Sequence, residues 1–407
     1  MKRQHTFLKA AIGGVAFCIA AGVCANILPE EISSFAARVD QAWADQMKTL
    51  DPKTSVVTGC DISKSAPPVD ATNNLYRMYK GRKGGWGPPG VGDAPLICGT
   101  ALSGLVDKWN ATGDETARRD AAKVAKGLLN LASLHGYPGF VCRGFCSDGR
   151  TTVSLSSRDQ YTHWAHGLWR YATSSMMEKD SPLLPEMKAR MNEVATFMAK
   201  RVTVESGWNF GLADSPEKDY RGICTMWGAD IWPHEAARLP MLYLVAYMIT
   251  GEEKWRDEYE RYIDEALEIT LRVETLTRQK IDARMPCYAL YQANASFEPI
   301  FAYESKRGSQ GAARAAKALR AMQDFAKIAL QRIGECNPQK PPYGMCWDGE
   351  LALTVLLTPG MECADRLDDF LAESIKRRNL EKCDLCRVAH IMSAYYRALC
   401  IKSKLAQ

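Results

Sequence analysis

The sequence has no long uncharged stretch beyond its first 25 residues, so we expect no membrane-spanning helix in the remainder of the chain. Alternation of polar and apolar residues, which is typical of strands, is scarce, and a β-rich fold is therefore not expected. No Ser- or Pro-rich linker and no abrupt change of composition divides the chain. These absences favour one large domain that is not a membrane protein.

An excess of one charge is also missing once the N-terminal segment is set aside. The whole chain has 52 basic and 47 acidic residues, a net charge of +5. Lys2, Arg3 and Lys9 are the basic residues of the first 25 positions, so the rest carries 49 basic residues against 47 acidic ones. Without a basic run, we expect no nucleic-acid partner.

Several catalytic motifs are absent as well. The chain shows no nucleophile elbow around a serine, no phosphate-binding glycine loop and no metallopeptidase motif. Cys383-x-x-Cys386 with His390 lacks the second close cysteine pair that a zinc site needs. We therefore expect neither a metal nor a cofactor.

The N-terminus has the pattern of a signal peptide. Lys2, Arg3 and Lys9 flank an apolar run from Ala10 to Ala21, and small residues follow up to Ala25. The run is too short and wrongly flanked to span a membrane. We predict cleavage after residue 25 and export to the periplasm or the medium, with no membrane attachment afterwards.

Cysteine usage agrees with export. Twelve of the fourteen cysteines remain once Cys18 and Cys24 leave with the signal. An even number in an exported chain predicts up to six disulfides. The pairs Cys142/Cys146 and Cys383/Cys386 are each close enough to bridge locally or with distant partners, and the spacing leaves the connectivity open.

Helical periodicity runs through most of the chain. Apolar residues recur at three- and four-residue spacing, for example Ile32, Phe35, Val39 and Trp43. The same spacing predicts helices over 29–49, 98–110, 116–134, 159–176, 183–203, 239–249, 286–305, 308–334, 349–358, 364–377 and 387–402.

A repeated unit organises these helices. Residues 104–132 and 243–269 each contain an apolar helix, a Thr-Gly-acidic turn and a more polar helix. About a dozen alternating helices predict an all-α fold, an (α/α)6 toroid with an inner and an outer ring, rather than an open solenoid. We divide the chain into a signal peptide (1–25), an N-terminal helix and loop extension (26–95) and the toroid domain (96–407).

In such a toroid we expect the site at one mouth, where loops lead into the inner helices and unpaired N–H groups favour anions. The loop 80–100 brings Trp86 and Asp93 to one such entrance. Trp86 could stack on a sugar or cover the edge of the ring, and Asp93 could equally cap the next helix.

The segment "SSRDQYTHWAHGLWRY" (156–171) lies at the second entrance, after Arg143. Asp159, His163 and His166 fall on one face of its helix, behind Arg158. Ser157 is a plausible N-cap, which explains a carboxylate in the first turn. A purely structural role therefore accounts for Asp159 but not for its neighbours, and Trp169 and Tyr171 are assigned to packing.

Two further entrances carry polar and aromatic residues. The segment 224–248 places Trp227, Asp230, Trp232, His234 and Glu235 before a strongly apolar helix. The segment 341–353 places Tyr343, Trp347, Asp348 and Glu350 before another. Aromatics that stack on sugars, carboxylates for acid/base work and arginines for uronate or sulfate groups together favour a carbohydrate site.

The stretches "PGFVCRGF", "SSRDQYTHWAHGLWRY", "MWGADIWPHEAARLPMLYLVAY" and "TGEEKWRDEYERY" resemble exported bacterial proteins of the six-hairpin glycosidase-like group. That group includes unsaturated glucuronyl hydrolases, glucuronidase-like enzymes and, more distantly, toroid polysaccharide lyases. The resemblance implies an inner-helix aspartate as acid/base, matched by Asp159, and a second carboxylate, matched by Asp93. The aromatic–arginine–glycine signature around the sugar differs in this chain.

The sequence thus predicts an exported glycoside hydrolase that acts on uronic-acid-containing oligosaccharides. Asp159, Asp93 and His166 are its candidate catalytic residues. The candidate substrate-binding residues are Arg143, Arg158, Tyr161, His163, Trp86, Trp227, Asp230, Trp232 and His234. Two alternatives remain open: a polysaccharide lyase with His166 or Tyr161 as base, and a glycan-binding protein without catalytic activity.

Overall fold

The structure is a computed structural model that describes residues 29–57, 71–72, 74–76, 92–177, 182–219, 221–273, 285–335, 347–361 and 385–405. The signal peptide, Trp86 and the helix expected over 364–377 lie outside these residues. None of the helices described is long and apolar enough to cross a membrane.

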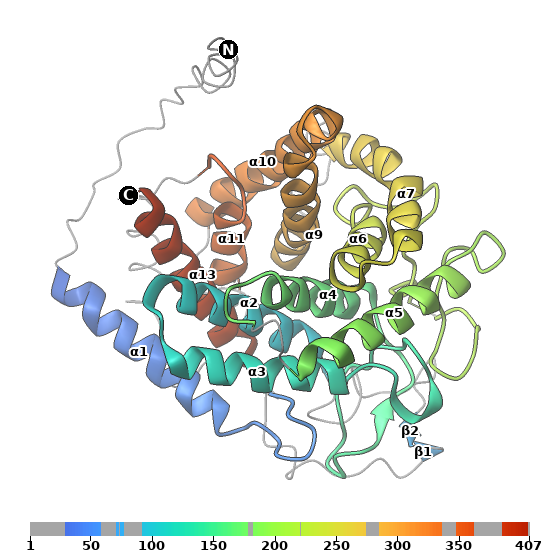
Figure 1. Ribbon diagram of the computed structural model, residues 1–407, viewed down its shortest axis with the longest axis horizontal. Helices are drawn as coiled ribbons and strands as arrows, with labels where there is room; N and C mark the ends of the chain where they lie inside the picture. Colours follow the sequence, from blue (N-terminus) through green and yellow to red (C-terminus); the bar gives the residue numbers. More distant parts are fainter. Residues whose placement is uncertain are drawn as a thin grey trace.

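Six of the described helices form a closed inner ring (Figure 1). They are α2 (Ala94–Thr112), α4 (Arg158–Ala172), α6 (Arg238–Thr250), α9 (Cys287–Lys306), α11 (Trp347–Leu356) and α13 (Leu385–Leu405). Each packs against the next in this order, and α13 packs against α2. The closed ring excludes an open solenoid and confirms the all-α class.

Outer helices surround this ring (Figure 1). They are α1 (Pro29–Met47), α3 (Glu115–Asn130), α5 (Leu183–Arg201), α7 (Glu253–Leu271) and α10 (Ala312–Glu335). α1 packs against α13, and its Asp40 receives hydrogen bonds from Lys108 and Tyr396 of the inner ring. The outer helices present one apolar face inward and a charged face outward, as the periodicity indicated.

Strand structure is confined to one small sheet among the described residues. β1 (Ala71–Thr72) pairs antiparallel with β2 (Leu75–Tyr76), which pairs parallel with β3 (Thr152–Val153). One 3₁₀ turn, Leu134–Gly136, follows α3, and a second, Gly308–Gln310, connects α9 to α10. The second turn occupies the start of the helix expected over 308–334, which begins at Ala312 instead.

The Thr-Gly-acidic turns end two inner helices as expected. Gly113 and Gly251 have φ of 68° and 77°, and each donates a backbone hydrogen bond back into the helix that it ends. Asp114 then caps α3, because its side chain accepts from the backbone N–H of Thr116.

Contacts between inner helices recur at constant sequence separation, which shows their direction. Thr100 meets His163 and Asp107 meets Arg170, both 63 residues apart. Ser393 and Cys400 bond to Thr100 and Asp107, both 293 residues apart. A constant separation requires parallel helices, so α2, α4 and α13 begin at the same end of the ring.

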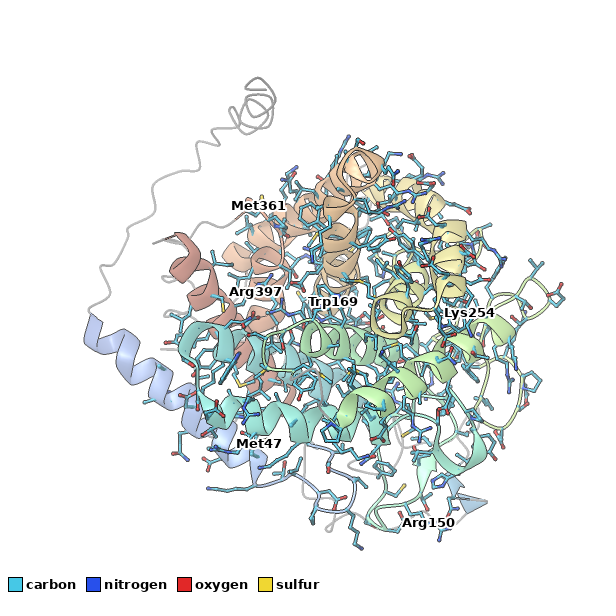
Figure 2. All side chains as sticks on the ribbon, viewed as in Figure 1. Met47, Arg150, Trp169, Lys254, Met361 and Arg397 are labelled. Atoms are coloured by element: carbon cyan, nitrogen blue, oxygen red, sulfur yellow. The ribbon has the colours of Figure 1, made fainter. Side chains whose placement is uncertain are left out.

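Glycine permits the close approach of α2 to α4. A Cβ on Gly99 would lie 2.1 Å from the carbonyl oxygen of His163, and a Cβ on Gly167 would lie 2.7 Å from Cα of Gly99. Side chains, including those of Trp169 and Arg397, fill the interior of the ring (Figure 2).

Four of the described cysteines form no disulfide. Cys98, Cys142, Cys146 and Cys224 are buried free thiols. Burial raises the pKa of Cys142 to about 11 and that of Cys146 to about 12. The predicted disulfides therefore stay a prediction for cysteines elsewhere in the chain.

Candidate functional site at the mouth of the ring

A carboxylate and a guanidinium face each other where α4 and α6 begin. Asp159, the second residue of α4, is ion-paired with Nη1 of Arg238, the first residue of α6. Arg238 Nη2 donates a second hydrogen bond, of 2.7 Å, to Oε1 of Gln292 on α9. One guanidinium therefore joins three inner helices at the mouth.

The surroundings of Asp159 keep it ionised. Burial alone would raise its pKa, but the guanidinium groups of Arg238, Arg158 and Arg143 outweigh burial and hold the pKa below its ordinary value. The side chain remains 30% exposed. Asp159 is therefore an accessible, anionic carboxylate at the mouth.

A second carboxyl group, that of Glu235, lies in the turn just before α6, and its pKa is shifted in the opposite direction from that of Asp159. Its side chain is 5% exposed, and burial raises its pKa against the lowering effect of Arg238 and Arg158. Arg158 is ion-paired with Glu235 and also donates to the carbonyl oxygen of Gly222 at 2.9 Å. The two carboxyl groups influence each other, since Asp159 raises the pKa of Glu235.

His234 lies beside Glu235 and is uncharged at neutral pH. Its Nε2 is 3.6 Å from Oε1 of Glu235, and its ring lies 6.1 Å from that of Trp232. Burial, aided by Arg238, lowers its pKa to about 3. His234 and Glu235 both precede α6, which begins at Arg238.

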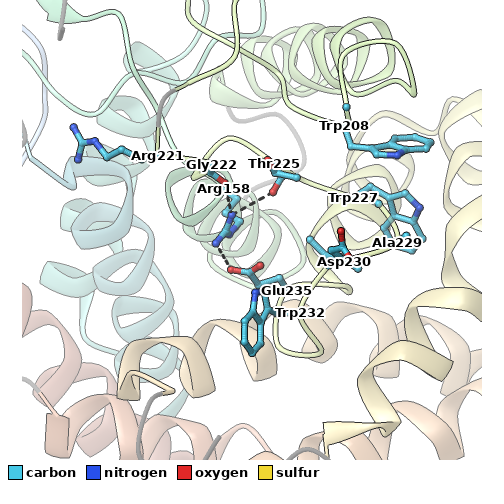
Figure 3. A pocket seen from close by; sticks show the side chains of 13 residues that line it. Arg158, Trp208, Arg221, Gly222, Thr225, Trp227, Ala229, Asp230, Trp232 and Glu235 are labelled. Carbon is cyan, nitrogen blue, oxygen red and sulfur yellow. Dashed lines mark hydrogen bonds and ion pairs between the residues drawn. The ribbon is translucent and has the colours of Figure 1, made fainter. Parts of the chain in front are cut away.

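Three tryptophans help to line a pocket of about 410 Å³ next to the carboxyl group of Glu235 (Figure 3). Trp208, Trp227 and Trp232 line it together with Asp230, Arg158 and Glu235. Trp227 is fixed in the core by edge-to-face contact with Tyr262 at 5.0 Å, whereas Trp232 is 53% exposed. The pocket thus combines flat apolar walls with charged groups.

Asp93 and Arg143 form a third charged pair at the mouth. Asp93 is the N-cap residue of α2 with φ of 50°, but its side chain makes no capping bond. Its Oδ1 accepts instead from Arg143 and, at 2.7 Å, from Gln160. Arg143 also donates to Oγ of Ser157 at 3.1 Å, so neither predicted cap uses its side chain for capping.

Three residues predicted for the site lie beneath it. Tyr161 is fully buried, with its hydroxyl bonded to backbone atoms of Val141 and Gly139. His163 and His166 are likewise buried, and Nε2 of His166 lies 2.7 Å from Oε2 of Glu298. Of the predicted site residues, the pocket is lined by Arg158, Trp227, Asp230 and Trp232. The pocket lining does not include Asp159, Asp93, Arg143, Tyr161, His163, His166 or His234.

Arg238, Gln292 and Trp208 were not foreseen as site residues. Arg238 follows Glu235 by three residues, a spacing that could have placed it at the same entrance. Trp208, in a turn with φ of 63°, reaches the pocket from a distant segment and has no sequence signal. Among the described residues, no group of three or more His, Cys, Asp and Glu side chains is arranged to hold a metal ion.

No protein-family model matches the sequence, and a search of curated proteins finds no match. Among solved structures, the chain is similar to the apo form of a β-1,3-1,4-glucanase from Paenibacillus sp. X4, with a TM-score of 0.50 and 9% identity over 94% of this chain and 96% of that one. A sugar epimerase from a ruminal bacterium gives a TM-score of 0.47 and 11% identity over 85% of both chains. At 9% identity, the likeness to the glucanase concerns the fold.

Proposed function

We propose that the protein is a glycoside hydrolase acting on uronic-acid-containing oligosaccharides, with Asp159 and Glu235 as its carboxyl pair. The observation that carries the proposal is that Asp159, paired with Arg238, and Glu235, paired with Arg158, meet at one mouth beside the tryptophan-lined pocket. Their pKa values are shifted in opposite directions. A pair of this kind divides the work of glycoside hydrolysis between a protonated acid and an ionised base or nucleophile.

The shifts assign the roles. Glu235, with its raised pKa, is the general acid that protonates the departing glycosidic oxygen. Asp159, with its lowered pKa, is the ionised partner that activates water or attacks the sugar carbon. This differs from the sequence-based hypothesis, in which Asp159 is the acid/base and Asp93 is the second carboxylate.

The surroundings of the pair suit an anionic sugar. Arg158 is one of two arginines that line the pocket, with Arg221, and planar guanidinium groups recognise carboxylates through paired hydrogen bonds. Trp208 and Trp232 offer flat apolar faces on which sugar rings stack. The likeness to a glucanase supports the proposal through the fold alone.

A screen of the protein from residue 26 onward against uronic-acid oligosaccharides tests the proposal, with reducing ends and ultraviolet absorbance read together. We expect new reducing ends without new absorbance. Glu235→Gln and Asp159→Asn should each lower kcat at least a hundredfold, since each removes a group that acts in the transition state. Glu115→Gln, on the exposed face of α3, is the matched control and should retain full activity.

Other outcomes of the screen distinguish the alternatives. Products that absorb in the ultraviolet would indicate a lyase, although Tyr161 and His166 are buried away from the pocket. Binding without any product would indicate a glycan-binding protein. Full activity of Asp159→Asn would exclude the carboxyl pair proposed above.

We also propose that the chain is exported, on the basis of the basic residues, apolar run and small residues before residue 26. Mass spectrometry of the protein recovered from a bacterial periplasm should show an N-terminus at Asn26. An intact N-terminus in the cytoplasm would contradict export.

A further inference from the structure

A set of polar side chains meets on the axis of the ring, below the mouth. Each comes from a different inner helix and lies between the fourth and seventh residue of that helix. We name this set the central cluster; its members are Thr100, His163, Tyr291, Glu350 and His390.

The members of the central cluster touch one another. His163 Nδ1 lies 3.4 Å from Oγ1 of Thr100, which also accepts from the hydroxyl of Tyr291 at 3.4 Å. The ring of Tyr291 lies 5.1 Å from that of His163 and 5.5 Å from that of His390. Nε2 of His390 is 3.8 Å from Oε1 of Glu350. Five helices therefore contribute to one continuous polar patch.

The central cluster and Gln292, the residue after Tyr291, contain hydrogen-bonding atoms that have no partner among the described residues. Nε2 of His163 and Nε2 of Gln292 have no hydrogen-bond partner among these residues, and both side chains are at least 99% buried. Burying such an atom unpaired is unfavourable, so each unpaired atom in a native core calls for an explanation. A bound ligand that supplies oxygen atoms would satisfy both.

Burial keeps Glu350 and His163 of the central cluster mainly uncharged near pH 7. Burial raises the pKa of Glu350 to about 8, so this carboxyl group is mainly protonated and can donate a hydrogen bond. Burial, with the neighbouring His390 and His166, holds the pKa of His163 well below its ordinary value. Neutral donors and acceptors suit hydroxyl groups better than they suit ions.

The central cluster lies one helical turn deeper in the ring than Asp159. His163 is one helical turn below Asp159 on α4, and Tyr291 precedes Gln292, which bonds to Arg238. Two turns further along the helices, by contrast, Glu298 forms ion pairs with Arg170 and Arg397. These ion pairs fill the centre of the ring at that level. The side chain of Glu350 is 11% exposed, and Tyr288, one turn above Tyr291, is 43% exposed.

We propose that the central cluster is a deep subsite that binds the hydroxyl groups of the sugar ring held at the mouth. The inference rests on the proposed function and deepens it, since Arg158 would recognise the carboxylate of the substrate while the cluster recognises its neutral hydroxyls. His163 Nε2, Gln292 Nε2 and the protonated Glu350 are the groups that contact the ligand.

Calorimetry with two probes, D-glucose and D-glucuronate, tests whether the central cluster binds sugar hydroxyls while Arg158 binds the carboxylate. His163→Phe keeps the ring contact with Tyr291 but removes both nitrogens, so binding of both probes should weaken about tenfold, the effect of one lost hydrogen bond. Glu350→Leu should weaken both probes similarly, whereas Glu350→Gln, which is neutral and still donates, should restore binding. Arg158→Met should weaken only D-glucuronate.

His135→Phe is the matched control, because His135 is near the surface with its Nε2 2.7 Å from the carbonyl oxygen of Arg150. Thermal unfolding of each variant shows whether it is folded. Unchanged binding by folded His163→Phe and Glu350→Leu overturns the subsite and leaves the proposed hydrolase standing. Wild-type protein that binds neither probe also overturns the subsite, while turnover in the oligosaccharide screen decides the hydrolase separately.

Discussion

Arg238 and Asp159 form an ion pair across two neighbouring inner helices, at the point where both helices begin. The arginine side chain is 2% exposed and the aspartate side chain 30% exposed. The carboxylate of Asp159 is therefore the solvent-accessible member of the pair, and the buried guanidinium of Arg238 holds it at the mouth of the ring. Its two functions, holding helices together and keeping Asp159 ionised, can be separated by experiment.

Replacing Arg238 by Met should raise the pKa of Asp159, because burial then acts with less opposing charge. The acid limb of kcat/KM against pH should consequently move to higher pH. The variant should also lose about 2 kcal/mol of unfolding free energy at neutral pH, less than a fully buried pair because Asp159 is partly solvated.

The decrease in the free energy of unfolding that Arg238→Met causes should itself depend on pH. A lowered folded-state pKa stabilises the protein above the unfolded pKa of Asp, and this contribution disappears as the pH falls through the folded value. Wild type and variant should therefore converge in acid. Arg118→Met, which removes an exposed pair with Glu115, serves as control and should change stability by less than about 0.5 kcal/mol. An unmoved acid limb would contradict the assignment of Asp159.

The general acid should be visible in the alkaline limb of the same profile. Activity should fall as the pH rises through the raised pKa of Glu235, because only the protonated form donates. Arg158 lowers that pKa, so Arg158→Met should move the alkaline limb to higher pH while KM for uronate substrates rises. An alkaline limb that moves to lower pH, or stays in place, would exclude Glu235 as the acid.

Much of the fold follows from local patterns. Three- and four-residue periodicity predicts helices whose ends the structure places within a few residues, and the glycines at 113 and 251 end helices as expected. The alternation of apolar and amphipathic helices predicts a double ring. Local patterns suffice here because burial of one helix face depends on spacing within the helix itself.

The candidate site is predicted less completely, because depth along the ring axis is not a local property. Spacing places Asp159, His163 and His166 on one face of α4. Only the packing of five other inner helices shows that Asp159 reaches the mouth while His166 is enclosed beside Glu298. The Arg238–Asp159 pair likewise spans 79 residues, a distance over which the sequence carries no pattern.

Glu298 should be important for stability rather than for catalysis. It accepts hydrogen bonds from His166 at 2.7 Å, Arg170 at 3.1 Å and Arg397 at 2.8 Å, and these groups overcome burial to hold its pKa far below the ordinary value. Glu298→Gln should cost about 3 kcal/mol in urea unfolding, because Arg170 and Arg397, which are largely enclosed, then keep only Asp107 as a shared counter-charge. Glu268→Gln, an exposed surface pair with Lys317, should cost almost nothing.

The buried thiols should resist modification in the folded protein. Burial raises the pKa of Cys98 and Cys146 to about 12 and that of Cys142 to about 11, so almost no thiolate exists at pH 8. Iodoacetamide labelling followed by peptide mapping should find these three positions unmodified before unfolding and modified afterwards. A Cys142–Cys146 bridge in the peptide map would contradict the free thiols and support the disulfide prediction.

Glu350 should make the protein less stable as the pH rises towards 8. Its folded pKa of about 8 exceeds the ordinary value of 4.5, so folding binds a proton between these values. The stabilisation by the neutral carboxyl group is fully present below the unfolded pKa and is lost as the pH rises through the folded one. Glu350→Gln cannot ionise, and its melting temperature relative to wild type should therefore increase steadily from pH 5 to pH 8.

The groups that face Glu350 sharpen the test of this pH dependence. His390 and Tyr291 lie nearest among the titratable residues of the central cluster, and a charged His390 would stabilise ionised Glu350 and reduce the effect. The double variant His390→Phe/Glu350→Gln should therefore match Glu350→Gln in its pH dependence if His390 stays neutral. A melting-temperature difference between wild type and Glu350→Gln that is constant from pH 5 to pH 8 would mean that Glu350 is ionised throughout, and the neutral subsite would then be wrong.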